Sequence, residues 1–193
     1  MDNEINIVTI VQARTGSTRL PNKVMLPLTG KPLLLRMYER IAASKLAGTI
    51  VIATTAESTD DKLVKLCEEN NINYFRGSSM DLLDRHYKAA LKYNPDAVIK
   101  IPSDCPLIDP NVIDKVIKYY INNRNKYDFV SNLHPATYPD GNDVEIMSFD
   151  SLKTAWANAN KDFERNIQRP IFGKILISSE SEMLNGKQVK IIR

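Results

Sequence analysis

The residues best suited to chemistry lie close to the N-terminus, in the sequence QARTGSTRLPNK at positions 12–23. Arg14, Arg19 and Lys23 supply three cations within this stretch, and small residues lie between them. An arginine can bind two phosphate oxygens at once, whereas a lysine acts as a point charge. The segment therefore favours binding of a polyphosphate, with an exposed basic turn of no function as the alternative.

The position of this segment in the chain supports the phosphate interpretation. It follows an apolar run, residues 5–11, that is typical of a buried strand. In open α/β sheets, ligands bind beyond the carboxyl ends of the strands. The segment contains neither GxxxxGK[ST] nor GxGxxG, so a Walker A loop and a dinucleotide fold are both disfavoured.

A second candidate group is Asp104, in the sequence AVIKIPSDCPLIDP at positions 97–110. It follows another apolar run and lies between Pro102 and Pro106, which restrict the backbone around it. Mg²⁺ commonly binds one or two carboxylates together with substrate phosphates. Asp104 is therefore a candidate metal ligand, and a carboxylate that only caps a turn is the alternative. Zinc is disfavoured, because Cys105 has no second cysteine or histidine pair beside it.

A third candidate is the sequence TYPDGNDVEI at positions 137–146. Asp140 belongs to an Asp-Gly turn signal. Asp143 and Glu145 alternate with apolar residues, which places both carboxylates on one face of a predicted strand. They could contact sugar hydroxyls or a metal, or they could form a solvated edge.

Composition limits the class of protein. The chain has 193 residues, of which 43% are hydrophobic and 25% charged, as expected for a single globular domain spanning residues 1–193. Its net charge of +3 is too balanced to indicate nucleic-acid binding. Two cysteines cannot form a disulfide framework. No apolar stretch approaches 18 residues, so we expect a cytoplasmic protein that does not cross a membrane.

Apolar runs alternate with amphipathic segments along the first 120 residues, which predicts a parallel α/β sheet. The predicted strands are residues 5–11, 49–54, 72–75, 97–101, 129–131 and 144–147. The predicted helices are residues 32–44, 59–70, 80–93, 110–122 and 149–160. Residues 131–143 are rich in turn formers and read as a loop over a site. We expect structural or surface roles for His86, His134 and Trp156.

Several motifs in this order resemble one family. QARTGSTRLPNKVMLPLTGKPLL, VIATT, GSSMDLLDRHYKAA, SDCPLIDP and YPDGNDVEIMSF are similar to the cytidylyltransferases, in the branch typified by spore coat polysaccharide biosynthesis protein F. The resemblance covers about residues 5–150. It implies a three-layer α/β/α fold with a mostly parallel, Rossmann-like sheet, of the nucleotide-diphospho-sugar transferase type. Homodimers are common among such relatives.

The resemblance also implies a reaction. A hydroxyl or phosphate oxygen of a sugar or sugar acid attacks the α-phosphorus of CTP and releases pyrophosphate, in the synthesis of a surface or spore-coat polysaccharide. Arg14, Lys23 and Asp104 would be catalytic, with Asp104 holding Mg²⁺. The implied nucleotide contacts are Gln12, Ala13, Arg14, Gly16, Ser17, Arg19, Lys23, Ala53, Thr54, Gly77, Asp84 and Arg85. The implied sugar contacts are Tyr138, Asp140, Asp143 and Glu145.

The sequence departs from the family pattern near its end. Relatives carry a REHVTP-like stretch where this chain has ERNIQRP, so Asn166 and Gln168 replace a histidine and a threonine. A following VDTPEDL-like segment, whose aspartate is a second metal ligand in relatives, is absent before Arg193. The chain is therefore truncated, or Asp143 substitutes for that ligand, or the protein is a catalytically weak nucleotide- or sugar-binding subunit. A glycosyltransferase that uses a nucleotide-sugar is a further alternative, although its usual DxD motif is missing.

Overall fold

A computed structural model describes residues 5–17, 19–133, 138–165 and 188–191. His134, Asn166 and Gln168 lie outside these ranges. Within the described ranges, none of the helices is both long and apolar enough to cross a membrane.

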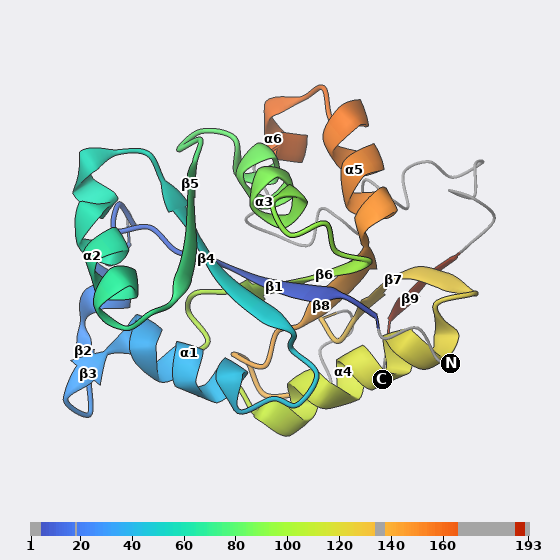
Figure 1. Cartoon of the computed structure of the whole chain (residues 1–193), viewed down its shortest axis with the longest axis horizontal. Helices are drawn as coiled ribbons and strands as arrows, with labels where there is room; N and C mark the ends of the chain where they lie inside the picture. The colour runs from blue at the N-terminus through green and yellow to red at the C-terminus, as the bar shows by residue number, and fades with distance from the viewer. Residues whose placement is uncertain (1–4, 18, 134–137, 166–187, 192–193) are drawn as a thin grey trace.

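A seven-stranded sheet forms the centre of the molecule (Figure 1). Its strands are β1 Ile7–Gln12, β4 Thr49–Thr55, β5 Asn73–Gly77, β6 Ala97–Pro102, β7 Tyr127–Ser131, β8 Glu145–Ser148 and β9 Gln188–Ile191. They are arranged in the order β5-β4-β1-β6-β8-β7-β9. Only β8, among these strands, runs antiparallel to its neighbours. The prediction of a mostly parallel sheet is confirmed.

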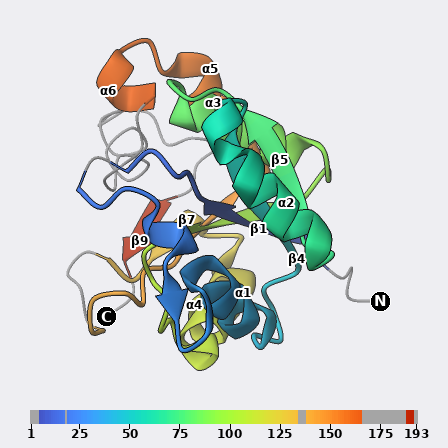
Figure 2. The same ribbon diagram turned by 90° about the vertical axis from the view of Figure 1, so that its left-hand side faces the viewer.

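Helices cover both faces of the sheet (Figures 1 and 2). They are α1 Leu33–Ala42, α2 Asp61–Glu69, α3 Leu82–Leu91, α4 Pro110–Asn123, α5 Phe149–Asn158 and the short α6 Asp162–Arg165. The apolar sides of α1, α2 and α4 pack on one face, and those of α3 and α5 pack on the other. The fold is therefore the predicted three-layer α/β/α arrangement.

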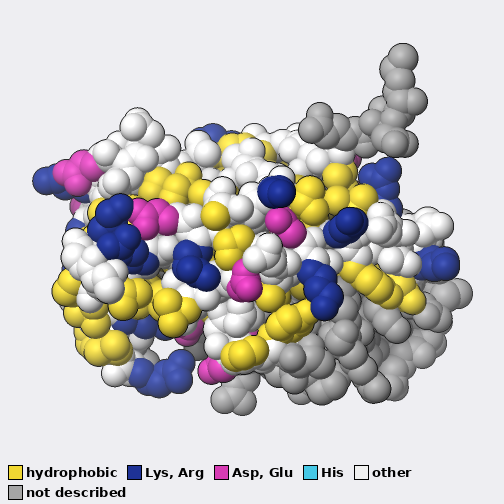
Figure 3. All heavy atoms as spheres, turned by 90° about the horizontal axis from the view of Figure 1, so that it is seen from below, with side chains coloured by type: hydrophobic (Ala, Val, Ile, Leu, Met, Phe, Trp, Pro, Cys, Tyr) yellow, Lys and Arg dark blue, Asp and Glu magenta, His cyan; other side chains and the backbone are white. Residues whose placement is uncertain are grey.

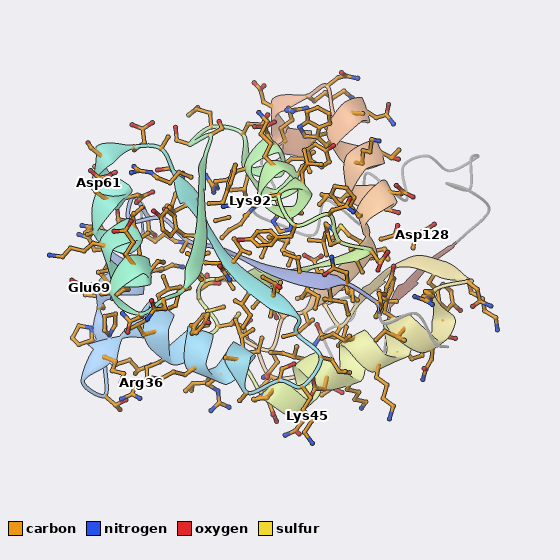
Figure 4. All side chains as sticks on the ribbon, viewed as in Figure 1. Arg36, Lys45, Asp61, Glu69, Lys92 and Asp128 are labelled. Carbon is orange, nitrogen blue, oxygen red and sulfur yellow. The ribbon has the colours of Figure 1, made fainter. Side chains whose placement is uncertain are left out.

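Two hydrophobic clusters, one on each face, hold the layers together. The first includes Met37, Leu63 and Ile113, and the second includes Leu83 and Leu152. Side chains fill the space between the sheet and the helices on both sides (Figure 4). The central strands read as continuous apolar runs because both of their faces are covered.

Local signals explain where several helices begin. Asp109 caps α4, its carboxylate accepting a hydrogen bond from the Asn111 backbone N–H at 2.9 Å, and Pro110 occupies the first turn. Asp81 caps α3 by accepting from the Asp84 backbone N–H at 2.8 Å. The predicted start at residue 80 is thus two residues early for that helix.

The remaining elements are short and were not predicted as separate elements; Pro32 of β3 and residues 59–60 were predicted as the starts of helices. They are the 3₁₀ turns Lys23–Met25 and Ser58–Asp60, the hairpin of β2 Pro27–Leu28 and β3 Lys31–Pro32, helix α6 and strand β9. The hairpin turns through Thr29 and Gly30, both at positive φ. Elements of two to four residues carry too little periodicity for a sequence pattern to detect.

On the face that carries α1 and α4, basic and acidic side chains are interspersed with hydrophobic and neutral ones (Figure 3). This distribution matches the nearly balanced charge of the sequence.

Candidate functional site

A cavity of about 200 Å³ lies at the carboxyl ends of β1 and β6. The strand register places Gln12 beside Pro102 of β6 and Ala53 of β4, so the segments that follow β1 and β6 meet here. The residues that line the cavity are Gln12, Ala13, Arg14, Ser17, Arg19, Lys23, Leu82, Arg85, Lys100, Ile101, Pro102, Ser103 and Asp104. This is the edge of the sheet at which open α/β proteins bind ligands.

The lining of the cavity is strongly cationic. Arg14, Arg19, Lys23, Arg85 and Lys100 all contribute to it, whereas Asp104 is the only carboxylate among the lining residues. Such a concentration of positive charge in a concave site attracts anionic ligands.

The two loops that form the rim are joined by an ion pair. Lys23 Nζ lies 2.9 Å from Asp104 Oδ2. The Lys23 side chain is 23% exposed and that of Asp104 is 51% exposed. A pair this open to water contributes at most about 1 kcal/mol to folding, so a ligand can separate it at little cost.

Asp60 holds the beginning of the basic loop in place through hydrogen bonds to Thr15. This aspartate is 1% exposed. Its Oδ1 accepts hydrogen bonds from the backbone N–H and the hydroxyl of Thr15 at 2.8 and 2.7 Å. Its Oδ2 accepts from the hydroxyls of Thr54 and Thr55 and from the Thr55 backbone N–H. Burial raises the pKa of Asp60, but the hydrogen bonds from Thr55, Thr15 and Thr54 outweigh it and hold the pKa below its usual value.

An acidic residue at the start of a predicted helix normally indicates a helix cap, but Asp60 makes no side-chain capping bond at the start of α2. Its carboxylate turns to the loop after β1 instead. A partner 45 positions away in the chain leaves no local signal in the sequence.

Arg85 is a buried guanidinium in the lining of the cavity. It is 1% exposed, and Nη1 donates to the Ser78 carbonyl oxygen at 2.6 Å. Among the described residues, no carboxylate forms an ion pair with it, and its Nε has no hydrogen-bond acceptor. Burial, with a smaller effect from Arg14, lowers the pKa of Arg85 to about 10, so it stays protonated at neutral pH.

Gly77 allows this arginine to pack against the end of β5. A Cβ atom at position 77 would lie 2.8 Å from Phe75 Cε1 and 2.9 Å from Arg85 Cγ. Any other residue would therefore displace the Arg85 side chain or the Phe75 ring. Gly77, predicted as a nucleotide contact, is absent from the cavity lining but leaves room for the Arg85 side chain.

The sequence matches a known family. Residues 8–187 fit the family model described as cytidylyltransferase. The chain belongs to the cytidylyltransferase family.

Two relatives and one solved structure illustrate the similarity. MJ1063 of Methanocaldococcus jannaschii is 39% identical over 166 residues, which is 86% of this chain and 66% of that protein. Spore coat polysaccharide biosynthesis protein SpsF of Bacillus subtilis is 36% identical over 131 residues, covering 66% of this chain and 55% of SpsF. A cytidylyltransferase structure from Leptospira borgpetersenii superposes with a TM-score of 0.86 at 31% identity, over 98% of this chain and 76% of that one. The chain thus spans between half and two thirds of the length of the two curated relatives.

Several residues predicted to contact the nucleotide in this cytidylyltransferase line the cavity, and others do not. Gln12, Ala13, Arg14, Ser17, Arg19, Lys23 and Arg85 line it, as does Asp104, the predicted metal ligand. Gly16, Ala53, Thr54, Gly77 and Asp84 are absent from the lining. Ala53 and Thr54 help to position the loop. The Ala53 carbonyl oxygen accepts a hydrogen bond from the Ala13 N–H at 3.1 Å, and the Thr54 hydroxyl donates one to Asp60.

Asp84 is engaged on α3 with other side chains. Its Oδ1 accepts from Trp156 Nε1 at 2.9 Å, and its Oδ2 lies 2.9 Å from Lys88 Nζ. Asp84 thus forms an ion pair with Lys88, one turn further along the helix. Trp156 stacks on Tyr87 with ring centroids 4.5 Å apart, which agrees with its predicted structural role.

The residues predicted to face the sugar, Tyr138, Asp140, Asp143 and Glu145, are absent from the cavity lining. The Tyr138 ring lies under Lys115, with Nζ 5.5 Å from the ring centroid. Glu145 is 1% exposed and forms an ion pair with Lys100 across β6 and β8, so a solvated edge is wrong for this residue. Burial raises the pKa of Asp143, and the charges of Asp140, Asp104 and Glu145 add to this effect.

Sequence reasoning missed five lining residues: Leu82, Lys100, Ile101, Pro102 and Ser103. Four of them belong to β6 or directly follow it, beside Asp104. Lys100 could have been identified from the sequence, because it is the one charged residue within an otherwise apolar run. A lysine in a buried strand requires a partner or a ligand.

Proposed function

We propose that this chain transfers CMP from CTP to an oxygen atom of a sugar or sugar acid and releases pyrophosphate. Membership of the cytidylyltransferase family supports this activity. The observation that carries it is the cationic cavity, in which Asp104 is the single lining carboxylate, at the carboxyl ends of β1 and β6. The name of the relative SpsF supports a role in polysaccharide synthesis, which we propose as the pathway.

In the proposed reaction, the acceptor oxygen forms a bond to the α-phosphorus of CTP. The bond between that phosphorus and the oxygen bridging to the β-phosphorus breaks, and pyrophosphate leaves with the electron pair. If the acceptor is a hydroxyl group, its proton passes to solvent; a phosphate oxygen has none to lose. Catalysis of this kind consists mainly of positioning and charge stabilisation.

The basic loop would bind the triphosphate. Arg14, Arg19 and Lys23 surround one side of the cavity and can neutralise negative charge on the phosphates. Lys23 would move from Asp104 to a phosphate oxygen, which the exposed geometry of the pair permits. Arg85, which is buried and forms no ion pair with a carboxylate among the described residues, would donate a hydrogen bond to the nucleotide.

Asp104 fits a role as a magnesium ligand. The described residues contain no group of three or more histidine, cysteine or acidic side chains arranged to hold a metal ion. Magnesium, however, often binds through one carboxylate and the phosphates of a nucleotide. When bound there, it would neutralise charge on the phosphates and on the departing pyrophosphate.

The activity is tested by pyrophosphate release with CTP, Mg²⁺ and a panel of sugar acids and sugar phosphates. We expect release with at least one acceptor and a loss of about 100-fold or more in Asp104→Asn. CTP binding without release for any acceptor would support the nucleotide-binding subunit instead.

The role of Asp104 is tested separately by CTP binding. In the absence of metal, we expect Asp104→Asn to bind CTP about threefold to tenfold more tightly, because a repulsive charge is removed and Lys23 is released. With Mg²⁺, we expect the native chain to gain affinity and the variant to gain little. Glu69→Gln removes an equivalent charge at the end of α2, outside the cavity lining, and is the control. Equal responses of Asp104→Asn and the native chain to Mg²⁺ would contradict the assignment.

A further inference from the structure

Beneath the cationic lining, a small polar network joins the end of β1 to α3. Gln12 lies at the last position of β1 and lines the cavity. Its side-chain Nε2 lies 3.1 Å from the Leu82 carbonyl oxygen and 3.1 Å from His86 Nδ1. His86 itself is fully buried, which agrees with the structural alternative for this residue.

The chemistry of these contacts fixes the orientation of the Gln12 amide. A backbone carbonyl oxygen can only accept, so the group that faces Leu82 must be the amide nitrogen. The same nitrogen donates its second hydrogen to His86 Nδ1, which must therefore be the unprotonated ring nitrogen. His86 then carries its proton on Nε2, as a neutral imidazole.

The environment of His86 favours this neutral form. Burial lowers the pKa of His86 to about 3, and the charges of Lys100 and Arg85 add to the effect. His86 therefore remains a hydrogen-bond acceptor for Gln12 throughout the neutral pH range.

With both amide hydrogens in use, only the side-chain carbonyl oxygen of Gln12 remains for a ligand. Gln12 is half-buried, and no donor among the described residues is bonded to its Oε1. The nearby lining residues Arg14 and Arg85 can only donate. Gln12 thus presents a fixed, neutral acceptor among cationic donors, and it suits an N–H or O–H group of the ligand rather than a phosphate.

We propose that Gln12 is the base-reading residue of this site, and that its Oε1 accepts a hydrogen bond from the 4-amino group of cytosine. His86 and the Leu82 carbonyl oxygen are positioning groups that prevent the amide from rotating. UTP carries a carbonyl oxygen at the same place on the base, so two acceptors would face each other. The inference rests on the proposed use of a cytidine nucleotide. Leaving such an acceptor unmatched weakens binding by about 10- to 100-fold.

The test measures dissociation constants of the full chain for CTP, UTP and 2′-deoxy-CTP by calorimetry in the presence of Mg²⁺. We expect the native chain to prefer CTP over UTP by about 10- to 100-fold and to bind 2′-deoxy-CTP nearly as well as CTP. Gln12→Met, similar in size but without an acceptor, should reduce the CTP-to-UTP preference to about onefold. His86→Leu should also reduce it, because the amide can then rotate.

Two further variants separate positioning from structural effects. In His86→Asn, the side-chain oxygen can replace Nδ1 as an acceptor, and we expect most of the preference to return. Tyr87→Leu, at a neighbouring buried position that stacks on Trp156, should lower the melting temperature without changing the preference.

Different failures of the experiment have different meanings. If the native chain binds CTP but Gln12→Met keeps its preference over UTP, base reading by Gln12 is wrong. If Gln12→Met changes the ratio of CTP to 2′-deoxy-CTP instead, the partner is the ribose hydroxyl and the cytosine assignment is overturned. Equal weakening of both nucleotides in His86→Leu would overturn the positioning role. If the native chain binds neither CTP nor UTP, the proposed function itself fails.

Discussion

Two buried charges near the cavity differ in where their partners lie. Asp60, below the basic loop, accepts hydrogen bonds from three threonines of its own chain. Arg85, which lines the cavity, donates a hydrogen bond to the Ser78 carbonyl oxygen and forms no ion pair with a carboxylate among the described residues. A buried charge that is matched within the chain stabilises the fold, whereas an unmatched one beside a cavity is available to a ligand. Mutation of Asp60 should therefore reduce stability, whereas mutation of Arg85 should mainly reduce ligand binding.

The largest effect on stability is expected at Asp60. Asp60→Ala leaves the Thr15 and Thr55 backbone N–H groups without their acceptor, so we expect the free energy of unfolding to fall by about 3–5 kcal/mol. Chemical denaturation measures this change. Asp61→Asn, one residue along, removes an exposed carboxylate that pairs with Arg76 at 2.7 Å, and should cost about 1 kcal/mol or less. Similar losses of unfolding free energy in both variants would contradict the structural role assigned to Asp60.

Arg85 should show the reverse pattern. Arg85→Met keeps much of the side-chain volume and removes a buried charge, so we expect the free energy of unfolding to change by no more than about 1 kcal/mol. CTP affinity should fall by about 100-fold, because a charged donor to the nucleotide is lost. Denaturation and calorimetry on the same preparation give both values. If Arg85→Met loses stability but retains CTP affinity, then Arg85, like Asp60, stabilises the fold and does not bind the nucleotide.

His86 gives a smaller effect that depends on pH. Its folded pKa of about 3 lies below the ordinary histidine value of 6.5, so the unfolded chain binds a proton more readily. Its contribution to stability is complete above pH 6.5 and is progressively lost as the pH falls toward 3. Between pH 6.5 and 5 this loss amounts to about 2 kcal/mol.

The measurement compares the free energy of unfolding with pH in the native chain and in His86→Asn. The difference between the two curves should change by this amount over that interval. Parallel curves would show that His86 is not held neutral by its burial beside Lys100 and Arg85.

Much of the sheet and the position of the site follow from the sequence, because both depend on local patterns. Apolar runs at the start of the chain and before Asp104 mark the strand ends where the cavity lies. The role of Asp60 did not follow, since its partner Thr15 is distant in the sequence and an acidic residue before a helix normally indicates a cap. The pairing of Lys100 with Glu145 depends on β8 lying antiparallel beside β6, which the alternation of strands and helices does not predict.

The bonds between Asp60 and Thr15 also affect how a ligand would arrive. They attach the start of the basic loop to the turn before α2, part of the folded core, so this part of the loop cannot swing open without breaking buried hydrogen bonds. The anion-binding surface near Thr15 therefore exists before any nucleotide reaches it. Association should then follow a single kinetic phase whose rate rises linearly with nucleotide concentration and falls with ionic strength.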